Sequence, residues 1–576
     1  MKKLFVYLKN YKKQCVLAPL FKMLEACFEL FIPLVVAAII DTGIANGDTS
    51  YVVWCCVIMV ALGAIGLTCT MFAQYFSAYC AVGFVSSVKH GLFKHISSLS
   101  YKEIDTLGTS TMITRMTSDI NQLQTGVNLT LRLFMRSPVI VFGAMIMAFI
   151  VDVEASLIFV VTIPLLALVV FGIILSTIPL YKKVQSRLDR VMSTSRENLT
   201  GVRVIRAFGL EEREKHKFHH QTEELNMAQR FVGRISAIMN PATYAIVNIS
   251  IAILIWQGAI QVDHGNLTQG QVIALYNYMS QILIELVKLA NLIVTITKAV
   301  ASGNRIEAIF EIEPSQSSGD VKSFDESANV VEFKNAYLRY EGSPEYSLEN
   351  ISFDAKAGEC IGIIGGTGSG KTSLVNMIGR FYDAEKGQVL FGGKDTKNYD
   401  LEFLREEIGI VPQKAVLFRG TVRDNLKWGN KNATDKEILS AIESAQATDV
   451  LNSKSEGLDY VIEEGGKNLS GGQKQRYTIA RALVKRPRVL ILDDSASALD
   501  YATDAKLRKS IKELDFKPTT FIVSQRTSSI MSCDKIIVLD DGKIVGMGKH
   551  DELLDSCLVY QEIYASQFKE EKNEKD

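Results

Sequence analysis

Cysteine and histidine form no pattern here that is typical of a metal centre or a disulfide scaffold. The sequence has nine cysteines and seven histidines, with no CxxC pair and no histidine cluster beside a cysteine. Most of the cysteines lie in or near apolar runs, where cysteine behaves as a small hydrophobic residue. We therefore expect neither a structural metal nor a framework of disulfides.

An excess of charge of either sign is also absent. The 576 residues include 63 basic and 63 acidic ones, so the net charge is zero and provides no attraction to nucleic acid. A hydrophobic content of 48% excludes disorder. No small-residue cleavage site follows the first apolar run, so we expect no cleavable signal peptide. A chain of this length is expected to form several domains.

Long apolar runs dominate the first half of the chain. Six segments are apolar enough to cross a bilayer, which requires about 20 residues each. They lie near residues 15–40, 51–80, 131–150, 154–180, 240–262 and 270–300. We therefore predict an all-α transmembrane domain with six spans. A bundle of buried soluble helices is the alternative.

The connections between these runs alternate in charge. Lysine and arginine precede the first run and fill the connections between runs two and three and between runs four and five. The other three connections, DTGIANGDTS, VDV and DHGNLTQG, contain neither residue. This alternation places both termini in the cytoplasm by the positive-inside rule. The two basic connections are about 50 and 60 residues long and helical in pattern, so the spans should continue tens of ångströms into the cytosol.

Ionisable residues also occur inside the apolar runs. Glu25 and Glu29 lie one helical turn apart near the inner end of the first run. They could bind a cation or a cationic substrate, or they could face water at the inner leaflet. Glu285 and Lys288 have helical spacing and could neutralise each other, or they could line a cavity.

A polar, serine-rich segment at 311–329 is typical of a linker, and the chain from 330 to 576 has the pattern of a soluble α/β domain. There, a predicted strand at Cys360–Ile364 leads into GGTGSGKT and then a helix. This is the phosphate-binding motif G-x-x-x-x-G-K-[ST] in its strand–loop–helix context. Backbone N–H groups and the helix N-terminus would hold the phosphates, while Lys371 reaches them and Thr372 offers a hydroxyl to Mg²⁺. The predicted residues are Gly365, Gly366, Thr367, Gly368, Ser369, Gly370, Lys371 and Thr372.

The stretch RVLILDDSASALD contains two adjacent carboxylates after an aliphatic strand. A buried carboxylate is costly unless it is paired. We predict that Val489–Leu492 is a core strand and that Asp493, at its carboxyl end, holds Mg²⁺. Asp494 would then stand beside the terminal phosphate, where a general base for an attacking water belongs.

The stretch NLSGGQKQRYTIARAL lies between these two motifs and carries a family resemblance. LSGGQ is the signature of ATP-binding cassette (ABC) proteins, and the order of GGTGSGKT, Gln413, LSGGQ, the LILDD strand and SALD resembles theirs. Six spans followed by one cassette resemble an ABC exporter half-transporter, over essentially the whole chain. The resemblance implies a multi-domain membrane protein. It would have a six-helix transmembrane domain at 1–310, with long cytoplasmic helix extensions, and an α/β P-loop nucleotide-binding domain at 330–576. ATP and Mg²⁺ would be its cofactors.

The resemblance also implies roles for individual residues. Tyr340 would stack on adenine, Gln413 would sense Mg²⁺ and the γ-phosphate, and Glu464 would contact the coupling helices. Short coupling helices near 105–115 and 198–210 would dock on the cassettes. The residues that would cap ATP held by the opposite cassette, or cross the interface between cassettes, are Ser470, Gly471, Gly472, Gln473 and Asp500.

Two positions depart from the family pattern. Asp494 stands where the family has Glu, and Gln525 stands where it has His. Aspartate is one methylene shorter, and glutamine has no titratable nitrogen. Both changes fall at the same γ-phosphate, so we predict that this chain's own site binds ATP but hydrolyses it slowly. The intact LSGGQ would serve a second site on a different polypeptide, as in heterodimeric exporters.

The expected function is export of hydrophobic or amphipathic small molecules across the plasma membrane by alternating access. The expected partners are a second, non-identical half-transporter, membrane lipid and a small-molecule substrate, with no nucleic acid. A lipid or peptide exporter, and an ATP-gated channel or regulatory subunit, are alternatives. The sequence does not disclose the substrate.

Overall fold

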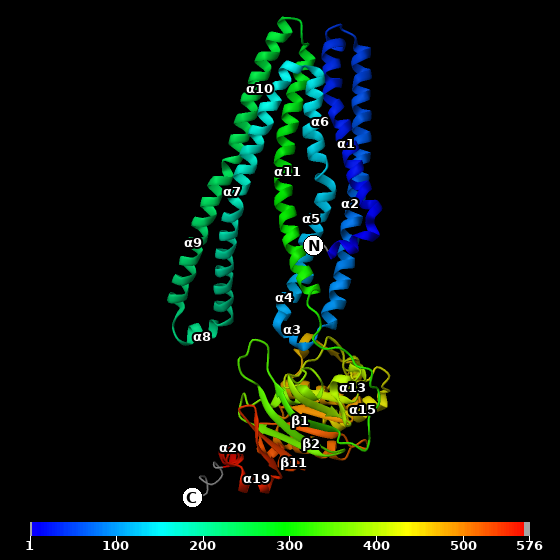
Figure 1. Cartoon of the computed structure of the whole chain (residues 1–576), viewed down its shortest axis with the longest axis vertical. Helices are drawn as coiled ribbons and strands as arrows, with labels where there is room; N and C mark the ends of the chain where they lie inside the picture. The colour runs from blue at the N-terminus through cyan, green and yellow to red at the C-terminus, as the bar shows by residue number, and fades with distance from the viewer. Residues whose placement is uncertain (1–2, 569–576) are drawn as a thin grey trace. The chain divides into compact units, whose positions relative to one another are not determined.

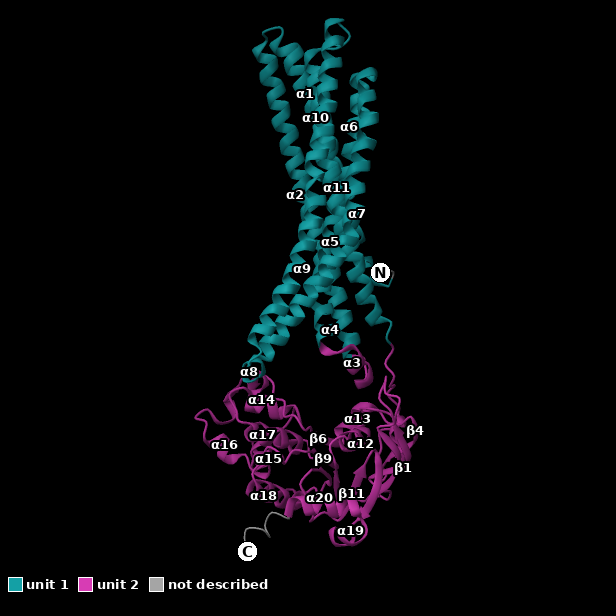
Figure 2. Ribbon diagram, turned by 90° about the vertical axis from the view of Figure 1, so that its left-hand side faces the viewer, with its two compact units in different colours: residues 1–97, 110–312 teal, residues 98–109, 313–576 magenta. Residues whose placement is uncertain are grey.

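The computed structural model describes residues 3–568. These residues form two compact units (Figure 2). The first contains residues up to 97 together with 110–312, and the second contains 98–109 together with the chain from 313 onward. The short segment 98–109 therefore packs with the second unit, although helices of the first unit precede and follow it in sequence.

The first unit is entirely helical (Figure 1). Six helical segments are long and apolar enough to cross a membrane: Leu4–Ile44, Thr49–Ser98, Thr109–Val151, Val153–Thr200, Glu211–Asp263 and Gln269–Phe310. The individual helices are α1 (Lys12–Ala38), α2 (Thr49–Ser98), α4 (Thr109–Thr114), α5 (Ile120–Leu133), α6 (Arg136–Val151), α7 (Val153–Thr200), α8 (Val202–Ala207), α9 (Glu211–Ala237), α10 (Met239–Asp263) and α11 (Gln269–Phe310).

Several of these helices greatly exceed the thickness of a bilayer. Helix α7 has 48 residues, which corresponds to about 72 Å at the α-helical rise, against about 30 Å of hydrocarbon. Its N-terminus is fixed by Asp152, whose Oδ1 accepts a hydrogen bond of 2.7 Å from the Ala155 N–H. Thr268 and Gln271 form a capping box at the start of α11. The long spans therefore continue as helices beyond the apolar layer.

Helix α11 occupies the centre of the first unit, packed against α1, α5, α6 and α10. Its Tyr278 is fully buried, and the hydroxyl donates to the Leu30 carbonyl of α1 at 2.7 Å. On the outside, by contrast, large apolar side chains are exposed, such as Trp54 at 69% and Trp256 at 72%. An apolar exterior around a packed helical interior is what a lipid environment requires.

The second unit is an α/β domain built on two main sheets. The larger has the strand order β12-β11-β3-β10-β9-β6, and the smaller, antiparallel sheet has the order β2-β1-β4-β5. The strands are β1 (Val331–Leu338), β2 (Leu348–Ala355), β3 (Cys360–Gly365), β4 (Lys386–Phe391), β5 (Lys394–Asp395), β6 (Ile408–Val411), β7 (Gly420–Thr421), β8 (Val461–Ile462), β9 (Val489–Asp493), β10 (Thr519–Val523), β11 (Lys535–Asp540) and β12 (Lys543–Gly548). The helices are α3 (Tyr101–Leu107), α12 (Lys371–Ile378), α13 (Leu401–Glu406), α14 (Val422–Lys427), α15 (Asp435–Ser444), α16 (Thr448–Asn452), α17 (Gly471–Val484), α18 (Tyr501–Lys512), α19 (His550–Ser556) and α20 (Leu558–Phe568).

Strands β3, β6, β9, β10 and β11 run parallel, so their carboxyl ends meet at one edge of the larger sheet. In the register, Val523 lies beside both Ile363 and Asp493. Ligands of open α/β sheets bind at this edge. The fold therefore brings together the segments after β3, β6, β9 and β10.

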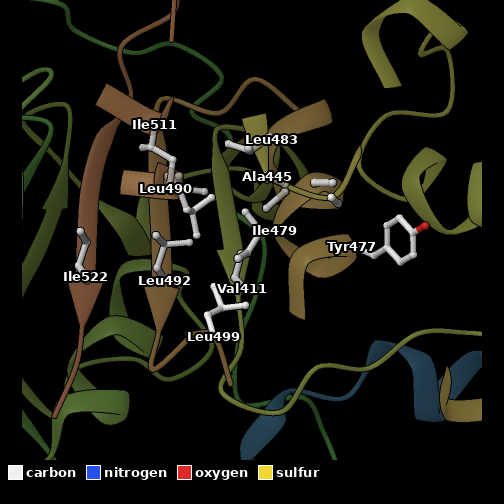
Figure 3. Close-up of a cluster of buried hydrophobic side chains, with 14 of the residues drawn as sticks. Val411, Ala445, Tyr477, Ile479, Leu483, Leu490, Leu492, Leu499, Ile511 and Ile522 are labelled. Atoms are coloured by element: carbon white, nitrogen blue, oxygen red, sulfur yellow. The ribbon is translucent and has the colours of Figure 1, made fainter. Parts of the chain in front are cut away.

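A buried cluster anchors α17 to this sheet (Figure 3). Ile479 and Leu483 of α17 belong to the same cluster as Leu490 and Leu492 of β9 and Ile522 of β10, and all five are at most 7% exposed. Burying one such aliphatic side chain contributes about 1.5–3 kcal/mol. The cluster therefore anchors α17 to the sheet through the second half of the helix.

These observations confirm the predicted fold class of a six-helix transmembrane domain followed by an α/β nucleotide-binding domain. The first coupling helix was expected near 105–115, and two short helices occur in and beside that range: α3 (Tyr101–Leu107) overlaps its start and α4 (Thr109–Thr114) lies within it. Gly108 ends α3 with φ of 72°, a conformation that glycine adopts without strain. In the second expected region, 198–210, the short helix α8 spans Val202–Ala207.

Candidate functional site

The loop between β3 and α12 curls around the ammonium group of Lys371. The Nζ atom donates to the carbonyls of Gly365 at 2.9 Å and Gly366 at 2.6 Å. Gly370 has φ of 94°, and a Cβ at this position would lie 2.8 Å from the Ser347 carbonyl oxygen. The tight loop therefore requires glycine here, and it holds the lysine against its own backbone.

A cavity of about 430 Å³ opens beside this loop. Ten of the residues singled out in the sequence line it: Tyr340, Thr367, Gly368, Gly370, Lys371, Thr372, Gln413, Asp493, Asp494 and Gln525. They come from the ends of β1, β3, β6, β9 and β10. The cavity thus joins five chain segments. Four of them follow parallel strands, as expected for the carboxyl edge of a parallel sheet, and Tyr340 adds a segment that follows the antiparallel strand β1.

Two oppositely charged groups are buried together in this cavity. Burial lowers the pKa of Lys371 from its ordinary value, while Asp494 and Asp493 oppose that shift. Burial raises the pKa of Asp493, which is only 5% exposed. The Thr372 hydroxyl donates to Asp493 Oδ1 at 3.1 Å. A further cation beside Asp493 would relieve the unfavourable burial of its charge.

The Thr372 hydroxyl and the Asp493 carboxylate fit a hard divalent cation that takes oxygen ligands. Among residues 3–568, no group of three or more His, Cys, Asp or Glu side chains could hold a metal by itself. Mg²⁺ is commonly bound by one or two protein oxygens together with phosphate oxygens. The residues present fit Mg²⁺ bound together with a nucleotide.

Asp494 follows Asp493 in an uncommon backbone conformation. Its φ is 46°, in the left-handed region that Asp and Asn enter more readily than other residues with side chains. The Asp494 N–H donates to the Val523 carbonyl at 3.0 Å. Its Oδ2 accepts from Gln413 Nε2 at 3.3 Å. The structure therefore brings the carboxylate and Gln413 into contact at the rim of the cavity.

The SGGQ stretch forms the N-terminal cap of α17, away from this cavity. The Gln473 N–H donates to Ser470 Oγ at 3.3 Å, and the Ser470 N–H donates to Gln473 Oε1 at 3.0 Å. A Cβ on Gly472 would lie 2.9 Å from the Ala498 carbonyl oxygen, so this turn packs closely on the segment after β9. Asp500 caps α18 by accepting from the Thr503 N–H at 2.8 Å. Among the cavity-lining residues in the described chain, none belongs to SGGQ, and Asp500 is absent as well.

Comparison with known proteins agrees with this geometry. The model of the ABC transporter transmembrane region matches residues 15–286, and the ABC transporter model matches residues 348–497. An ABC transporter ATP-binding protein of Bacillus subtilis (strain 168) is 34% identical, with all of both chains covered. The chain belongs to the ABC transporter family. It is an exporter-type half-transporter with one transmembrane domain and one cassette.

Other relatives of this half-transporter have more specific names. A putative multidrug export ATP-binding/permease protein of Bacillus subtilis (strain 168) is 31% identical, with 98% of this chain and 99% of the relative covered. An ATP-dependent lipid A-core flippase of Syntrophus aciditrophicus (strain SB) is 31% identical, over 88% and 84%. The structure of a bacterial Atm1-family ABC exporter with ATP bound superposes with a TM-score of 0.79 at 23% identity, over 97% and 98% of the two chains. That likeness supports the fold.

Tyr340 of the half-transporter is connected to α3 through a second tyrosine that the sequence analysis missed. The Tyr340 hydroxyl lies 2.9 Å from Ser373 Oγ, and its ring meets Tyr382 edge to face at 5.0 Å between centroids. Tyr382 donates a hydrogen bond to Asp105 of α3, and burial together with Asp105 raises the pKa of this tyrosine. Tyr101 of α3 stacks on Phe381 at 4.5 Å. The only signal in the sequence is the aromatic pair at 381–382, directly after α12.

Gln525 is also supported by residues outside the predicted set. Its side chain is exposed and lines the cavity, while its backbone carbonyl accepts from Gln567 Nε2 of α20 at 2.7 Å. Gln567 Oε1 accepts in turn from the Thr527 N–H at 2.9 Å. The last described helix therefore holds the loop that carries Gln525. Glu464 opens a short 3-10 helix, Glu464–Gly466, and is exposed.

Proposed function

We propose that this half-transporter uses ATP to export hydrophobic or amphipathic small molecules, as one half of a heterodimer with one slow and one competent ATP site. Residues 1–310 would be the transmembrane domain, 311–329 a linker and 330–576 the cassette. Both termini would lie in the cytoplasm and the spans in the plasma membrane, in keeping with the distribution of lysine and arginine.

The observation that carries the proposal is the position of Asp494 and Gln525. Both line the cavity that contains Lys371, Thr372 and Asp493. Glutamine cannot carry a proton as histidine does. A carboxylate set back by about 1 Å can reduce the rate about 100-fold. We infer that this site binds the nucleotide and hydrolyses it slowly.

The intact SGGQ cap argues for an unlike partner. Ser470 and Gln473 hold each other at the start of α17, and the cluster behind Ile479 and Leu483 fixes that helix. A well-formed signature would be able to cap ATP that is held by the phosphate-binding loop of another chain. That chain would supply the catalytic Glu and the switch His that this one lacks, and its own signature would be altered.

Each residue then has a definite task. The backbone between Gly365 and Gly370 and the Lys371 ammonium bind the phosphates, and the ring of Tyr340 stacks on the base. Thr372, Gln413 and Asp493 provide oxygens for Mg²⁺, which when bound neutralises phosphate charge. Asp494 orients an attacking water and accepts its proton. Asp105 of α3, through Tyr382, connects the base-stacking ring to the segment between the second and third spans.

The proposed kind of transported molecule is supported by the names of two relatives and by the apolar character of the spans. One relative is named for multidrug export and another for flipping lipid A-core, so an amphipathic cargo suits both. Lipid export is therefore the second candidate, favoured by the flippase relative. Dye efflux and lipid movement in vesicles that contain both chains distinguish the two.

The deciding experiment measures ATP hydrolysis by this chain alone and with its partner. We expect slow turnover alone, strong stimulation by a partner that carries Glu after its LILD-type strand, and loss of stimulation when that Glu is changed to Gln. Brisk, transport-coupled hydrolysis by a homodimer of this chain would overturn the proposal.

A further inference from the structure

Six ionisable side chains meet inside the first unit, where helices α1, α6 and α11 pack against one another. Three are acidic and three are basic, and all are held in a continuous set of ion pairs. The members of this charge cluster are Lys22, Glu25, Glu29, Arg136, Glu285 and Lys288.

Arg136 of α6 is the centre of the charge cluster. It donates through Nη1 to Glu285 of α11 and through Nη2 to Glu29 Oε2 of α1, the latter at 2.6 Å. Ser137 Oγ donates to the other Glu285 oxygen at 2.9 Å. The arginine is 8% exposed, and its buried Nε makes no hydrogen bond within residues 3–568. That Nε faces Glu25 Oε1 at 3.7 Å, so the centre keeps one unused donor directed into the cluster.

Two lysines complete the charge balance. Lys22 pairs with Glu25, and its Nζ also donates to Thr70 Oγ1 of α2 at 3.4 Å. Lys288 Nζ donates to Glu285 Oε1 at 2.8 Å. Glu25 and Glu29 both have cationic partners in the charge cluster, so the two carboxylates do not form an unpaired site for a lone cation. The Glu285–Lys288 pair exists, but it is one part of a larger neutral network.

The two most exposed members have opposite charges. The Glu29 side chain is 35% exposed and the Lys288 side chain is 45% exposed, whereas the other four are at most 15% exposed. Glu29 pairs with Arg136 and Lys288 pairs with Glu285, and Arg136 and Glu285 in turn form a buried pair with each other. The charge cluster therefore offers one accessible carboxylate and one accessible ammonium on either side of a buried pair.

The charge cluster also lies at a particular depth. Glu29, Arg136 and Glu285 are each about 15 residues from the helix ends at the short, non-basic connections, or about 23 Å along the axis. In an apolar layer about 30 Å thick, this is the half nearer the basic connections. Ionisable residues at such positions are costly and usually functional. A headgroup that dips inward from that leaflet would reach them.

We propose that this charge cluster binds the headgroup of a zwitterionic amphiphile, a molecule with an ammonium and a phosphate or carboxylate a few ångströms apart on an apolar tail. The inference deepens the proposed export function and rests on it for the identity of the cargo. A ligand with a single charge would leave one charge of the neutral network uncompensated at low dielectric. A zwitterion exchanges partners without changing the net charge. Its ammonium pairs with Glu29 and its anionic group pairs with Lys288, the two most exposed members of the charge cluster.

Binding is measured on the full chain in neutral detergent with three single-tailed probes of equal tail length. These are lysophosphatidylethanolamine, which is zwitterionic, lysophosphatidylglycerol, which is anionic, and an alkyltrimethylammonium cation. We expect the zwitterion to bind at least about tenfold more tightly than either other probe. Glu29→Gln and Lys288→Gln should each weaken it about tenfold through loss of a charge-assisted hydrogen bond. Lys298→Gln, at an exposed lysine of the same helix, is the matched control and should change nothing.

The double variant Glu29→Gln with Lys288→Gln keeps the charge cluster neutral but removes both groups that would contact the ligand. It therefore shows whether binding depends on those two contacts or only on the zero net charge of the cluster. Unchanged zwitterion binding in this variant, or stronger binding of the cation by the native chain, would overturn the site. In vesicles, ATP-dependent movement of tail-labelled phosphatidylethanolamine identifies cargo, and binding without movement identifies a resident lipid; either result keeps the site. If the native chain binds the zwitterion selectively but shows no ATP-driven transport, the export function is overturned and the site is kept. Intact transport without selective binding would overturn the site alone.

Discussion

Lengthening Asp494 by one methylene tests the predicted slow hydrolysis most directly. Asp494 Oδ2 accepts from Gln413 Nε2 at 3.3 Å, which is long for a hydrogen bond of this type. The change Asp494→Glu advances the carboxylate by about 1 Å, and a displacement of that order alters the rate about 100-fold. This corresponds to about 2.7 kcal/mol of activation free energy. The φ of 46° suits Asp better than Glu, so a modest fall in the melting temperature should accompany the gain in rate.

The assay is steady-state ATP hydrolysis by the full chain at concentrations at which two copies pair, so that an intact Ser470–Gln473 cap of a second copy faces each site. We expect kcat to rise up to about 100-fold with KM nearly unchanged, since the substitution acts on the transition state. Asp494→Asn is the matched control, because Asn also tolerates the left-handed conformation but cannot accept the proton, and it should abolish residual turnover. If Asp494→Glu and Asp494→Asn both leave kcat within about twofold of the native value, carboxylate reach is not limiting and the reasoning fails.

Two further predictions concern the buried Asp493 and the partly buried Tyr382 of the second unit. Burial raises the pKa of Asp493, so the folded state binds this proton more tightly than the unfolded state, and stability falls as pH rises from the ordinary carboxyl pKa through the raised one. Asp493→Asn should therefore raise the melting temperature of the nucleotide-free chain near pH 8 but not near pH 3, which lies below the ordinary carboxyl pKa. It should also remove magnesium-dependent hydrolysis. An equal shift of the melting temperature at both pH values would contradict the prediction. Tyr382→Phe removes the donor to Asp105 and should lower the free energy of unfolding by about 1 kcal/mol in denaturant titrations. The matched variant Tyr501→Phe, at an exposed tyrosine, should have no effect, and an equal loss in both would refute the special role of the Tyr382 contact.

The sequence was enough to predict which cassette segments lie together around the cavity, because that grouping follows from short-range rules. The cavity segments after β3, β6, β9 and β10 each follow a parallel strand, and parallel strands end at one edge of the sheet. Tyr340 is the exception, because it follows β1 of the antiparallel sheet. Knowing that β3 precedes GGTGSGKT and that β9 precedes Asp494 was therefore enough to bring Lys371 and Asp493 together. The six apolar spans were equally predictable, since length and hydropathy alone decide which helices suit a bilayer.

The contacts that the sequence analysis missed join residues far apart in the chain. Arg136 is 107 residues from Glu29 and 149 from Glu285, and neither helical spacing nor composition connects them. The rule of helical spacing compares only residues one turn apart. It therefore pairs Glu285 with Lys288 and Glu25 with Glu29, and it cannot connect either pair to Arg136. Tyr382 and Asp105 are 277 residues apart, so their pairing likewise depends on tertiary packing.

The length of α7 has a mechanical consequence. Treated as a rod of about 72 Å, a helix of 48 residues that tilts by about 5° around its midpoint displaces each tip by about 3 Å. Pro164 and Pro179 lie inside it, and each removes a backbone hydrogen bond and so softens bending at its own position. A small rotation of one end of α7 would thus displace the other end sideways by several ångströms, and the helix can bend at Pro164 and Pro179.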